Sequence, residues 1–400
     1  MGQCVPSFDT GVSMPRHVVT TVPPGRRRRW QLSTILTVAL VLSGAAAFLT
    51  TSTASAQACG GGGTNALVTQ SGGTYTAANG GSTVYSGGSY GDAVRAAIGS
   101  LTSGRNSQER VVVDASGSIG ASVIGLPSHT SLEVCGTMDV GNASGRGAIE
   151  ALNATNVSVP FLTMTGSPYF GMRFYGMNGL HLGQITLNLN GGLGIRFERD
   201  FPGSTNVRMD DVFVSGTGNH GVETWNVDGL TIGTITARDV DFAGLLLNNT
   251  RNAEIGTVDG ENVATGTGYA VFRTANRNGR IGNSYPTNIH VGEVIARGGG
   301  RGIFCVSESG GLVIDRVDIA NTGNNAMLIE NCYNVTVAAQ GGSVTGPGSI
   351  RIAARSEFPN TSDVTLSNMT VTNSAITESP CAVDTVVSNN TMVNSPLNIC

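Results

Sequence analysis

The composition of this chain limits its chemistry. Its 400 residues are 40% hydrophobic and only 12% charged, with 57 glycines and a net charge of −4. All 23 basic residues are arginine, which excludes lysine chemistry such as Schiff-base formation. The acidic balance argues against nucleic acid as a partner. Abundant glycine with few charges is typical of a solenoid, in which most side chains face a dry interior or a tight turn.

Residues 1–56 have the features of an export signal. A basic stretch at 26–29 precedes an apolar run at 36–42, and small residues at 54–56 form a cleavage pattern. The apolar run is short for a membrane span. We therefore expect a secreted, extracellular protein without a stable membrane anchor.

Residues 57–109 are expected to form a glycine-rich lead-in and an N-terminal cap. Val94, Ala97, Ile98 and Leu101 follow the i, i+3, i+4, i+7 pattern of a short amphipathic helix. A helix at this place would cover the open end of a solenoid, where strand edges are otherwise exposed.

From residue 110 to residue 400 the chain is expected to form one repetitive domain. A short motif begins at Gly171, Gly194, Gly221 and Gly244, and looser copies follow. Alternate residues within each copy are apolar, which predicts strands with one buried face. Turn-forming Gly, Asn, Asp and Ser separate the strands, and no helical period lies between them. The pattern predicts an all-β, right-handed parallel β-helix of roughly ten coils with C-terminal closure. The protein would be a monomer or a homotrimer packed along its flanks.

Six of the seven cysteines lie beyond the export signal, and an even number in an exported chain predicts disulfide bonds. Cys305 and Cys332 are about one coil apart and could join adjacent coils. Two further pairs could fasten the ends of the domain, namely Cys59 with Cys135 and Cys381 with Cys400. The cysteine spacings are not those of a metal site, so no metal is expected there.

Outward side chains of a solenoid stack in columns across neighbouring coils, about 4.8 Å apart. One expected column contains Arg173, Arg196, Glu223 and Leu246, and the next contains Tyr175, Glu198, Trp225 and Asn248. Arg273 would join the second column if its copy of the motif is shifted by one residue. Glu198 and Glu223 would have α-carbons on the order of 8 Å apart. Their carboxyl groups could then act as acid and base in glycoside hydrolysis.

The neighbouring residues suit an acidic sugar. Tyr175 and Trp225 can stack on a sugar ring, and Arg173 and Arg196 can bind a carboxylate. Asn248 and Arg273 complete the expected substrate-binding set. His220, at the start of the same strand, could carry a proton or hold the substrate. The arginine-rich segment 273–280 could form the wall of a groove for anionic sugar, or a solvated loop. Arg–Glu ladders are ordinary on solenoid surfaces, but this cluster in a charge-poor chain favours a functional role.

The chain resembles the pectin-lyase-like β-helix superfamily, which includes pectate lyases and polygalacturonases. The coil repeats over 110–375 carry the resemblance, and residues 219–222 (Asn-His-Gly-Val) resemble the Gly-His-Gly element of polygalacturonases. Arg351-Ile352 is similar to their Arg-Ile-Lys element, but Ala353 replaces the lysine. Their catalytic Asp pair has no counterpart one coil before His220, where this chain has Glu198. The resemblance implies the superfamily and no particular family within it.

Three functions are open at this point. The first is a secreted glycoside hydrolase of an acidic, pectin-like polysaccharide, with Glu198 and Glu223 as acid and base and no cofactor. The second is a polysaccharide lyase in which an arginine removes the proton α to a uronate carboxyl, with calcium as a possible cofactor. The third is a non-enzymatic glycan-binding or surface β-helix protein.

Overall fold

The structure of the protein is a computed structural model that describes residues 58–400. The predicted export signal lies outside the described residues. Within them, no helix is both long enough and apolar enough to cross a membrane.

Each coil contributes one short strand to a 12-stranded sheet, here called sheet B. Its strands are β6 (Ile124–Gly125), β8 (Gly147–Leu152), β10 (Phe170–Tyr175), β12 (Leu193–Phe197), β14 (Val222–Trp225), β16 (Leu245–Asn248), β18 (Phe272–Ala275), β20 (Ile303–Cys305), β22 (Asn325–Glu330), β24 (Ser349–Ala353), β27 (Ile376–Glu378) and β30 (Leu397–Asn398). All neighbouring strands of sheet B pair in parallel.

The rest of each coil lies in an 18-stranded sheet, here called sheet A. Its strands are β1 (Ala66–Ser71), β2 (Thr74–Asn79), β3 (Ser82–Gly87), β4 (Glu109–Asp114), β5 (Gly117–Gly120), β7 (Thr130–Val140), β9 (Thr155–Gly166), β11 (Asn178–Leu189), β13 (Ser204–Ser215), β15 (Val227–Arg238), β17 (Arg251–Glu261), β19 (Ile289–Arg297), β21 (Ser309–Ala320), β23 (Cys332–Thr345), β25 (Ser362–Ser367), β26 (Met369–Thr372), β28 (Val383–Ser388) and β29 (Thr391–Val393). Residues 206–209 and 212–214, each an apolar-alternating stretch, are parts of a single long strand, β13.

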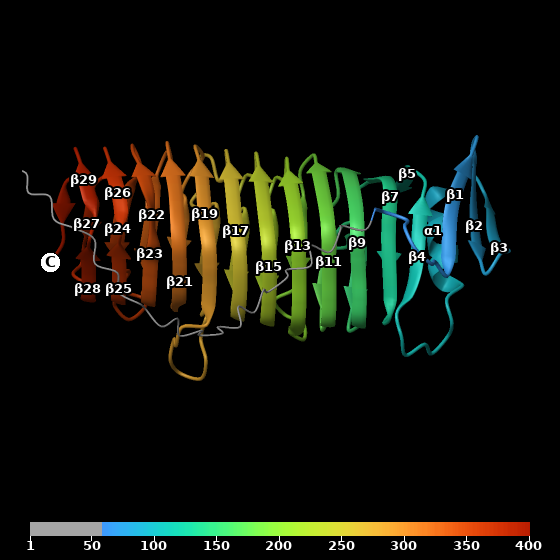
Figure 1. Cartoon of the computed structure of the whole chain (residues 1–400), viewed down its shortest axis with the longest axis horizontal. Coiled ribbons are helices and arrows are strands. Elements are labelled where there is room, and N and C mark those ends of the chain that lie inside the picture. Colours follow the sequence, from blue (N-terminus) through green and yellow to red (C-terminus); the bar gives the residue numbers. More distant parts are fainter. Residues whose placement is uncertain (1–57) are drawn as a thin grey trace, which may run out of the picture. The chain divides into compact units, whose positions relative to one another are not determined.

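The coils stack along one axis and confirm the parallel β-helix (Figure 1). They make about 13 turns, more than the roughly ten expected. The additional coils lie toward the ends, where the strands of sheet B shorten to two or three residues, as in β6, β27 and β30. Such short strands are too brief to repeat the alternating motif.

The repeated glycines are explained by how closely the coils approach. A Cβ atom on Gly194 would lie 2.3 Å from the carbonyl oxygen of Gly221, and one on Gly221 would lie 2.8 Å from that of Gly244. One and three residues farther along the motif, the side chains point into the core. Phe174 and Phe197 are fully buried, with ring centroids 5.3 Å apart. Glycine thus marks the start of these strands of sheet B because a side chain there would strike the next coil.

Asparagines in the left-handed region end several strands of sheet B. Asn226, Asn249 and Asn276 have φ values of 57°, 42° and 55°. Short polar side chains tolerate this conformation, and their amides can bond along the stack. Asn249 Nδ2 donates to Asn226 Oδ1 at 2.7 Å. The expected turn chemistry is therefore present, and it aligns one edge of sheet B from coil to coil.

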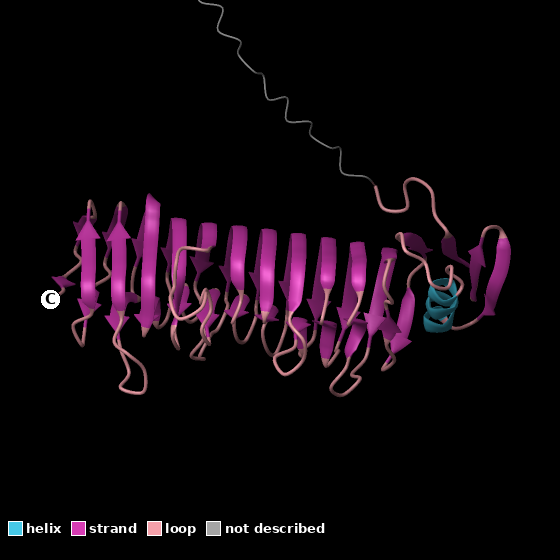
Figure 2. Ribbon diagram, turned by 90° about the horizontal axis from the view of Figure 1, so that it is seen from below, coloured by secondary structure: helices cyan, strands magenta, loops and turns pink. Residues whose placement is uncertain are grey.

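Helix α1 (Tyr90–Gly99) follows a meander in which β1, β2 and β3 pair antiparallel. The hydroxyl of Ser89 caps the helix by accepting the Asp92 N–H at 3.2 Å. Val94 and Ala97 are fully buried, so the predicted apolar stripe does face a partner. The helix lies at the end of the stack that contains β1–β3 (Figure 2).

Three disulfides join the six cysteines in the predicted pairs. Cys59–Cys135, Cys305–Cys332 and Cys381–Cys400 have Cα–Cα distances of 5.5, 6.2 and 5.7 Å. Three disulfides are compatible with an exported protein.

Candidate functional site

The outward residues of sheet B form one column through successive coils. From β8 to β20 it contains Glu150, Arg173, Arg196, Glu223, Leu246, Arg273 and Phe304. The expected sequence from Arg173 to Leu246 is confirmed. The placement of Arg273 in the second column was wrong, because Phe272 takes the inward place opposite Leu245 and turns Arg273 toward the outer face beside Leu246.

The first four residues of this column, together with Glu198 of the second column, form a continuous row of ion pairs, here called the ladder. The Arg173 guanidinium lies between two carboxylates, 2.7 Å from Glu198 and 3.1 Å from Glu150. Arg196 bridges Glu198, at 3.4 Å, and Glu223. The Arg173 side chain is 12% exposed and that of Glu223 is 6% exposed. Both arginines thus have their charge balanced within the protein.

Glu150 was not anticipated from the sequence. It accepts bonds from Arg146 at 2.6 Å and from the Gly147 N–H at 2.9 Å, besides its pair with Arg173. Burial raises the pKa of Glu150, but hydrogen bonds from Arg146, Gly147 and Arg173 outweigh it and hold that pKa below its usual value. Extending the repeat back by one coil from Arg173 would have found this residue.

Glu223 is held by its neighbours in the second column. The Trp225 indole N–H donates to Glu223 Oε1 at 2.6 Å, and Asn248 Nδ2 lies 3.4 Å from the same oxygen. Asn248 is only 1% exposed and also donates to the Thr224 carbonyl. The structure therefore does not place Asn248 where a substrate could touch it, and its amide positions Glu223 instead. Glu223 and Glu198 share Arg196, so neither predicted catalytic carboxylate is free of an arginine.

Tyr175 faces outward but is covered on one side. Its ring stacks on Phe201 with centroids 4.4 Å apart, and the Arg173 guanidinium lies 5.6 Å from the ring centre. The Tyr175 ring therefore buttresses the Arg173 end of the ladder.

Arg273 differs from the ladder arginines because it has no ion pair among the described residues. Its guanidinium lies 4.6 Å from the centre of the Tyr269 ring and 5.0 Å from that of Phe304. Its Nε is buried without a hydrogen-bond partner. Burial is the main cause of a lowered pKa at Arg273. Leu246 and Phe304 flank it in the column, so the charge stands in an apolar surrounding.

His220 lies beside this arginine and is 6% exposed. Its Nδ1 accepts the Ala243 N–H at 3.0 Å, so the proton of the neutral ring is on Nε2. Its ring centroid is 5.0 Å from that of Tyr269 and 5.5 Å from that of Phe242. Burial, with the charges of Arg273 and Arg196, lowers the pKa of His220 to about 3. The imidazole is therefore neutral in ordinary buffers and offers an N–H.

Phe242 and Tyr269 were missed by the sequence reasoning, although a signal for them exists. His220, Phe242 and Tyr269 each stand one or two residues before the start of a motif copy, where an aromatic ring recurs. This position places the three rings at the N-terminal edge of β14, β16 and β18, next to one another.

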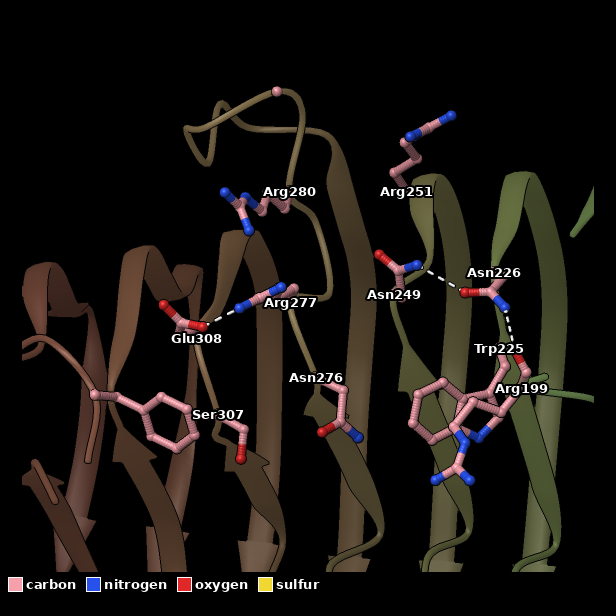
Figure 3. A pocket seen from close by; sticks show the side chains of 12 residues that line it. Arg199, Trp225, Asn226, Asn249, Arg251, Asn276, Arg277, Arg280, Ser307 and Glu308 are labelled. Atoms are coloured by element: carbon pink, nitrogen blue, oxygen red, sulfur yellow. Dashed lines mark hydrogen bonds and ion pairs between the residues drawn. The ribbon is translucent and has the colours of Figure 1, made fainter.

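A groove of about 570 Å³ follows the C-terminal edge of the same strands (Figure 3). We call it the edge groove. Its lining includes the rings of Trp225 and Phe358, the turn asparagines 226, 249 and 276, one carboxylate (Glu308) and four arginines: Arg199, Arg251, Arg277 and Arg280. Residues 276–288, between β18 and β19, form one wall. Of the two alternatives left open for segment 273–280, the structure shows the wall of a groove, and its ligand is not established.

Comparison with known proteins adds little at the level of function. No protein-family model matches the chain, and no curated protein matches it. Among solved structures, the A-module of the Azotobacter vinelandii mannuronan C-5 epimerase AlgE4 is similar, with 11% identity and a TM-score of 0.45 over 77% of this chain and 93% of that module. The AlgE6 A-module is similar to the same degree, with 12% identity, a TM-score of 0.45 and coverage of 78% and 92%. Similarity this low says nothing about activity.

Proposed function

We propose that the protein acts on an acidic, uronate-containing polysaccharide bound across the outer face of sheet B, and that it removes the proton α to a uronate carboxyl, as a polysaccharide lyase does. The observation that carries this proposal is Arg273, a partly buried side chain whose guanidinium has a buried, unpartnered Nε and no ion pair among the described residues.

A buried, unpaired cation is costly in the folded protein. Desolvating an ion costs several kcal/mol unless a counter-ion repays it. The neighbouring outward positions hold Leu246 and Phe304, so an apolar residue would fit this part of the column. An anionic ligand would supply the missing partner, and a planar carboxylate can accept two parallel hydrogen bonds from a guanidinium.

The same contact favours chemistry at the carbon next to that carboxylate. When a base takes the α-proton, negative charge develops on the carboxylate oxygens, and a cation already in place stabilises it. In β-elimination the base takes the proton from C5, the C4–O4 bond breaks, a C4=C5 double bond forms, and the leaving O4 gains a proton. This reaction needs one acceptor and one donor near the carboxylate-binding cation.

Two side chains beside Arg273 suit these roles. The Tyr269 ring packs against the guanidinium, and its phenolic oxygen, once deprotonated, is the candidate acceptor. His220 is neutral, carries its proton on Nε2 and is the candidate donor to the leaving oxygen. We assign calcium no role in this reaction. The only described group of three close His, Cys, Asp or Glu ligands is Cys59, Glu133 and Cys135, and its two cysteines form a disulfide.

The hydrolase with Glu198 and Glu223 is the second candidate, because both carboxylates lie on neighbouring coils of the same face. A hydrolase needs one carboxyl group that keeps its proton near neutral pH. Both oxygens of Glu223 accept hydrogen bonds, one from Arg196 and one from Trp225, so neither is free to carry that proton. This candidate therefore requires Arg196 to move when substrate binds. Binding of a glycan without turnover is the third candidate.

A product screen separates the three candidates. The purified protein is incubated with polygalacturonate, alginate, xylan and neutral glycans, with calcium and with chelator, and read by reducing ends and by ultraviolet absorbance. The proposal predicts both signals on a polyuronate. Reducing ends without absorbance would replace it with the Glu198/Glu223 hydrolase, and saturable binding without either signal would replace it with a binding role.

Variants then test the residue assignment. Arg273→Met should lower the rate on the polyuronate by roughly 10²-fold or more, the loss typical of one transition-state donor. Arg316→Met is the matched control, since Arg316 is an exposed outward residue of sheet A. Equal activity of Arg273→Met and Arg316→Met would exclude Arg273 from the reaction.

A further inference from the structure

We propose that the edge groove is a second binding site for the acidic polysaccharide, which holds a part of the chain away from Arg273. The identity of the ligand rests on the proposed function, whereas the existence of the site rests on the geometry of the groove.

The groove and the Arg273 cluster lie at opposite ends of the same strands. His220 and Tyr269 come just before β14 and β18, whereas Trp225 and Asn276 stand at the last position of β14 and just after β18. A four-residue strand spans roughly 13 Å. A ligand group at one end therefore cannot be the group bound at the other, and one long chain would have to pass both.

The charge of the groove is opposite to that of the protein. Its lining has four arginines and one glutamate, in a chain whose net charge is −4. At least two of these arginines are also accessible to a ligand. Arg251 pairs with Asp228 at 2.9 Å and Arg277 with Glu308 at 3.1 Å, but their side chains are 51% and 58% exposed. Exposed ion pairs contribute little, so ligand carboxylates could replace them, unlike the buried pairs of Arg173.

The groove also offers aromatic surface in a fixed position. The indole N–H of Trp225 is bound to Glu223, which sets the ring at the groove end of β14. Phe358 lies in the loop after β24, five coils farther along, or about 24 Å at the spacing of stacked strands. Sugar rings stack on such faces, and this length suits several sugar residues rather than one.

The wall formed by residues 276–288 is anchored rather than free. The Tyr285 hydroxyl donates to the Glu308 carbonyl, and Asn334 Nδ2 donates to the Tyr285 carbonyl at 2.9 Å. Asn288 Nδ2 donates to the Gly279 carbonyl at 2.7 Å. These bonds fix the segment that carries Arg277 and Arg280, and Figure 3 shows both side chains on that segment, with Arg277 paired to Glu308. A solvated loop would not need such fastening, so the groove has the character of a built site.

Tryptophan fluorescence can test the site directly, because the chain has two tryptophans, Trp30 and Trp225. In a Trp30→Phe background the fluorescence comes from Trp225 alone, which lines the groove. Titration with polygalacturonate should change it saturably. Arg251→Gln combined with Arg277→Gln should weaken this binding by roughly 10- to 100-fold, as expected for two charge-assisted contacts. Arg208→Gln with Arg297→Gln, two ion-paired arginines of sheet A, is the matched control and should bind like the parent.

The outcomes distinguish this inference from the proposed function. A saturable Trp225 response that Arg273→Met retains supports the groove, even if no product forms on any substrate. No fluorescence response, or equal affinity of the groove variant and the control, would overturn the proposed binding site in the groove, whether or not the protein forms product from the polysaccharide. Tighter binding of dextran sulfate than of polygalacturonate would overturn the assignment of a carboxylate ligand.

Discussion

Replacing Arg273 with methionine should leave the folded protein at least as stable as the wild type, although Arg273 is central to the proposed site. Its side chain is partly buried, with the guanidinium against Tyr269 and Phe304, and has no ion pair among the described residues. Methionine has a similar length and can fill the space between the two rings. The substitution removes the cost of burying an unpaired charge.

The size of the effect follows from two opposing contributions. Loss of the cation–π contacts costs about 1–2 kcal/mol. Replacement of buried charges by well-packed apolar groups is often neutral or stabilising by about 1–4 kcal/mol. The free energy of unfolding should therefore stay constant or rise slightly. Arg196→Met should do the opposite, because it leaves the buried Glu223 without its arginine partner. Breaking a buried pair on one side costs about 3–5 kcal/mol.

The assay is urea unfolding of both variants and the wild type at pH 7, followed by circular dichroism without ligand. The expected order of midpoints is Arg273→Met at or above wild type, with Arg196→Met well below. A loss of more than about 2 kcal/mol, the upper end of the cation–π cost, in Arg273→Met would refute the reasoning. Arg273 would then have a stabilising partner in the free protein, and its need for an anionic ligand would disappear.

Three further predictions concern His220, a motif glycine and a disulfide. The pKa of His220 is about 6.5 in the unfolded chain and is lowered to about 3 in the folded protein, so the contribution of the neutral ring to stability is complete above pH 6.5 and is lost as pH falls toward 3. Between pH 7 and 4.5 the melting temperature of His220→Gln should therefore fall less than that of the wild type. Parallel curves of melting temperature against pH would contradict this. Gly221→Ala should destabilise the folded protein by about 1–3 kcal/mol, since the new Cβ would lie 2.8 Å from the Gly244 carbonyl oxygen. Gly125→Ala is the control in thermal unfolding, because Gly125 has open space around it. Equal melting temperatures of the two variants would disprove the packing argument. Replacing both Cys305 and Cys332 with alanine should lower the free energy of unfolding by about 3.5 kcal/mol, because the disulfide closes a 27-residue loop in the unfolded chain. An unchanged urea midpoint would contradict this and would indicate that the stacked coils already restrain that loop.

The sequence by itself determined the architecture of this protein. Alternating apolar residues identify the buried face of a strand because side chains in a strand point to opposite sides. The glycine at the start of the four regular copies marks a close approach of successive coils, where a Cβ on Gly194 would strike Gly221. The 27-residue separation of Cys305 and Cys332 agrees with the coil length, and the other two disulfide pairs were predicted from their places near the two ends of the domain.

The tertiary structure alone decided which outward residues are available to a ligand. The register near residue 270 has no motif glycine to fix it, so the column that contains Arg273 became clear only from the pairing of β16 with β18. Ion pairing across coils also depends on that register. Glu150 and Glu198 therefore neutralise Arg173, and Asn248 is buried beneath Glu223. Alternation along a strand separates inside from outside, but it does not say which charges meet, because contacts between coils join residues that are a full turn apart in the sequence.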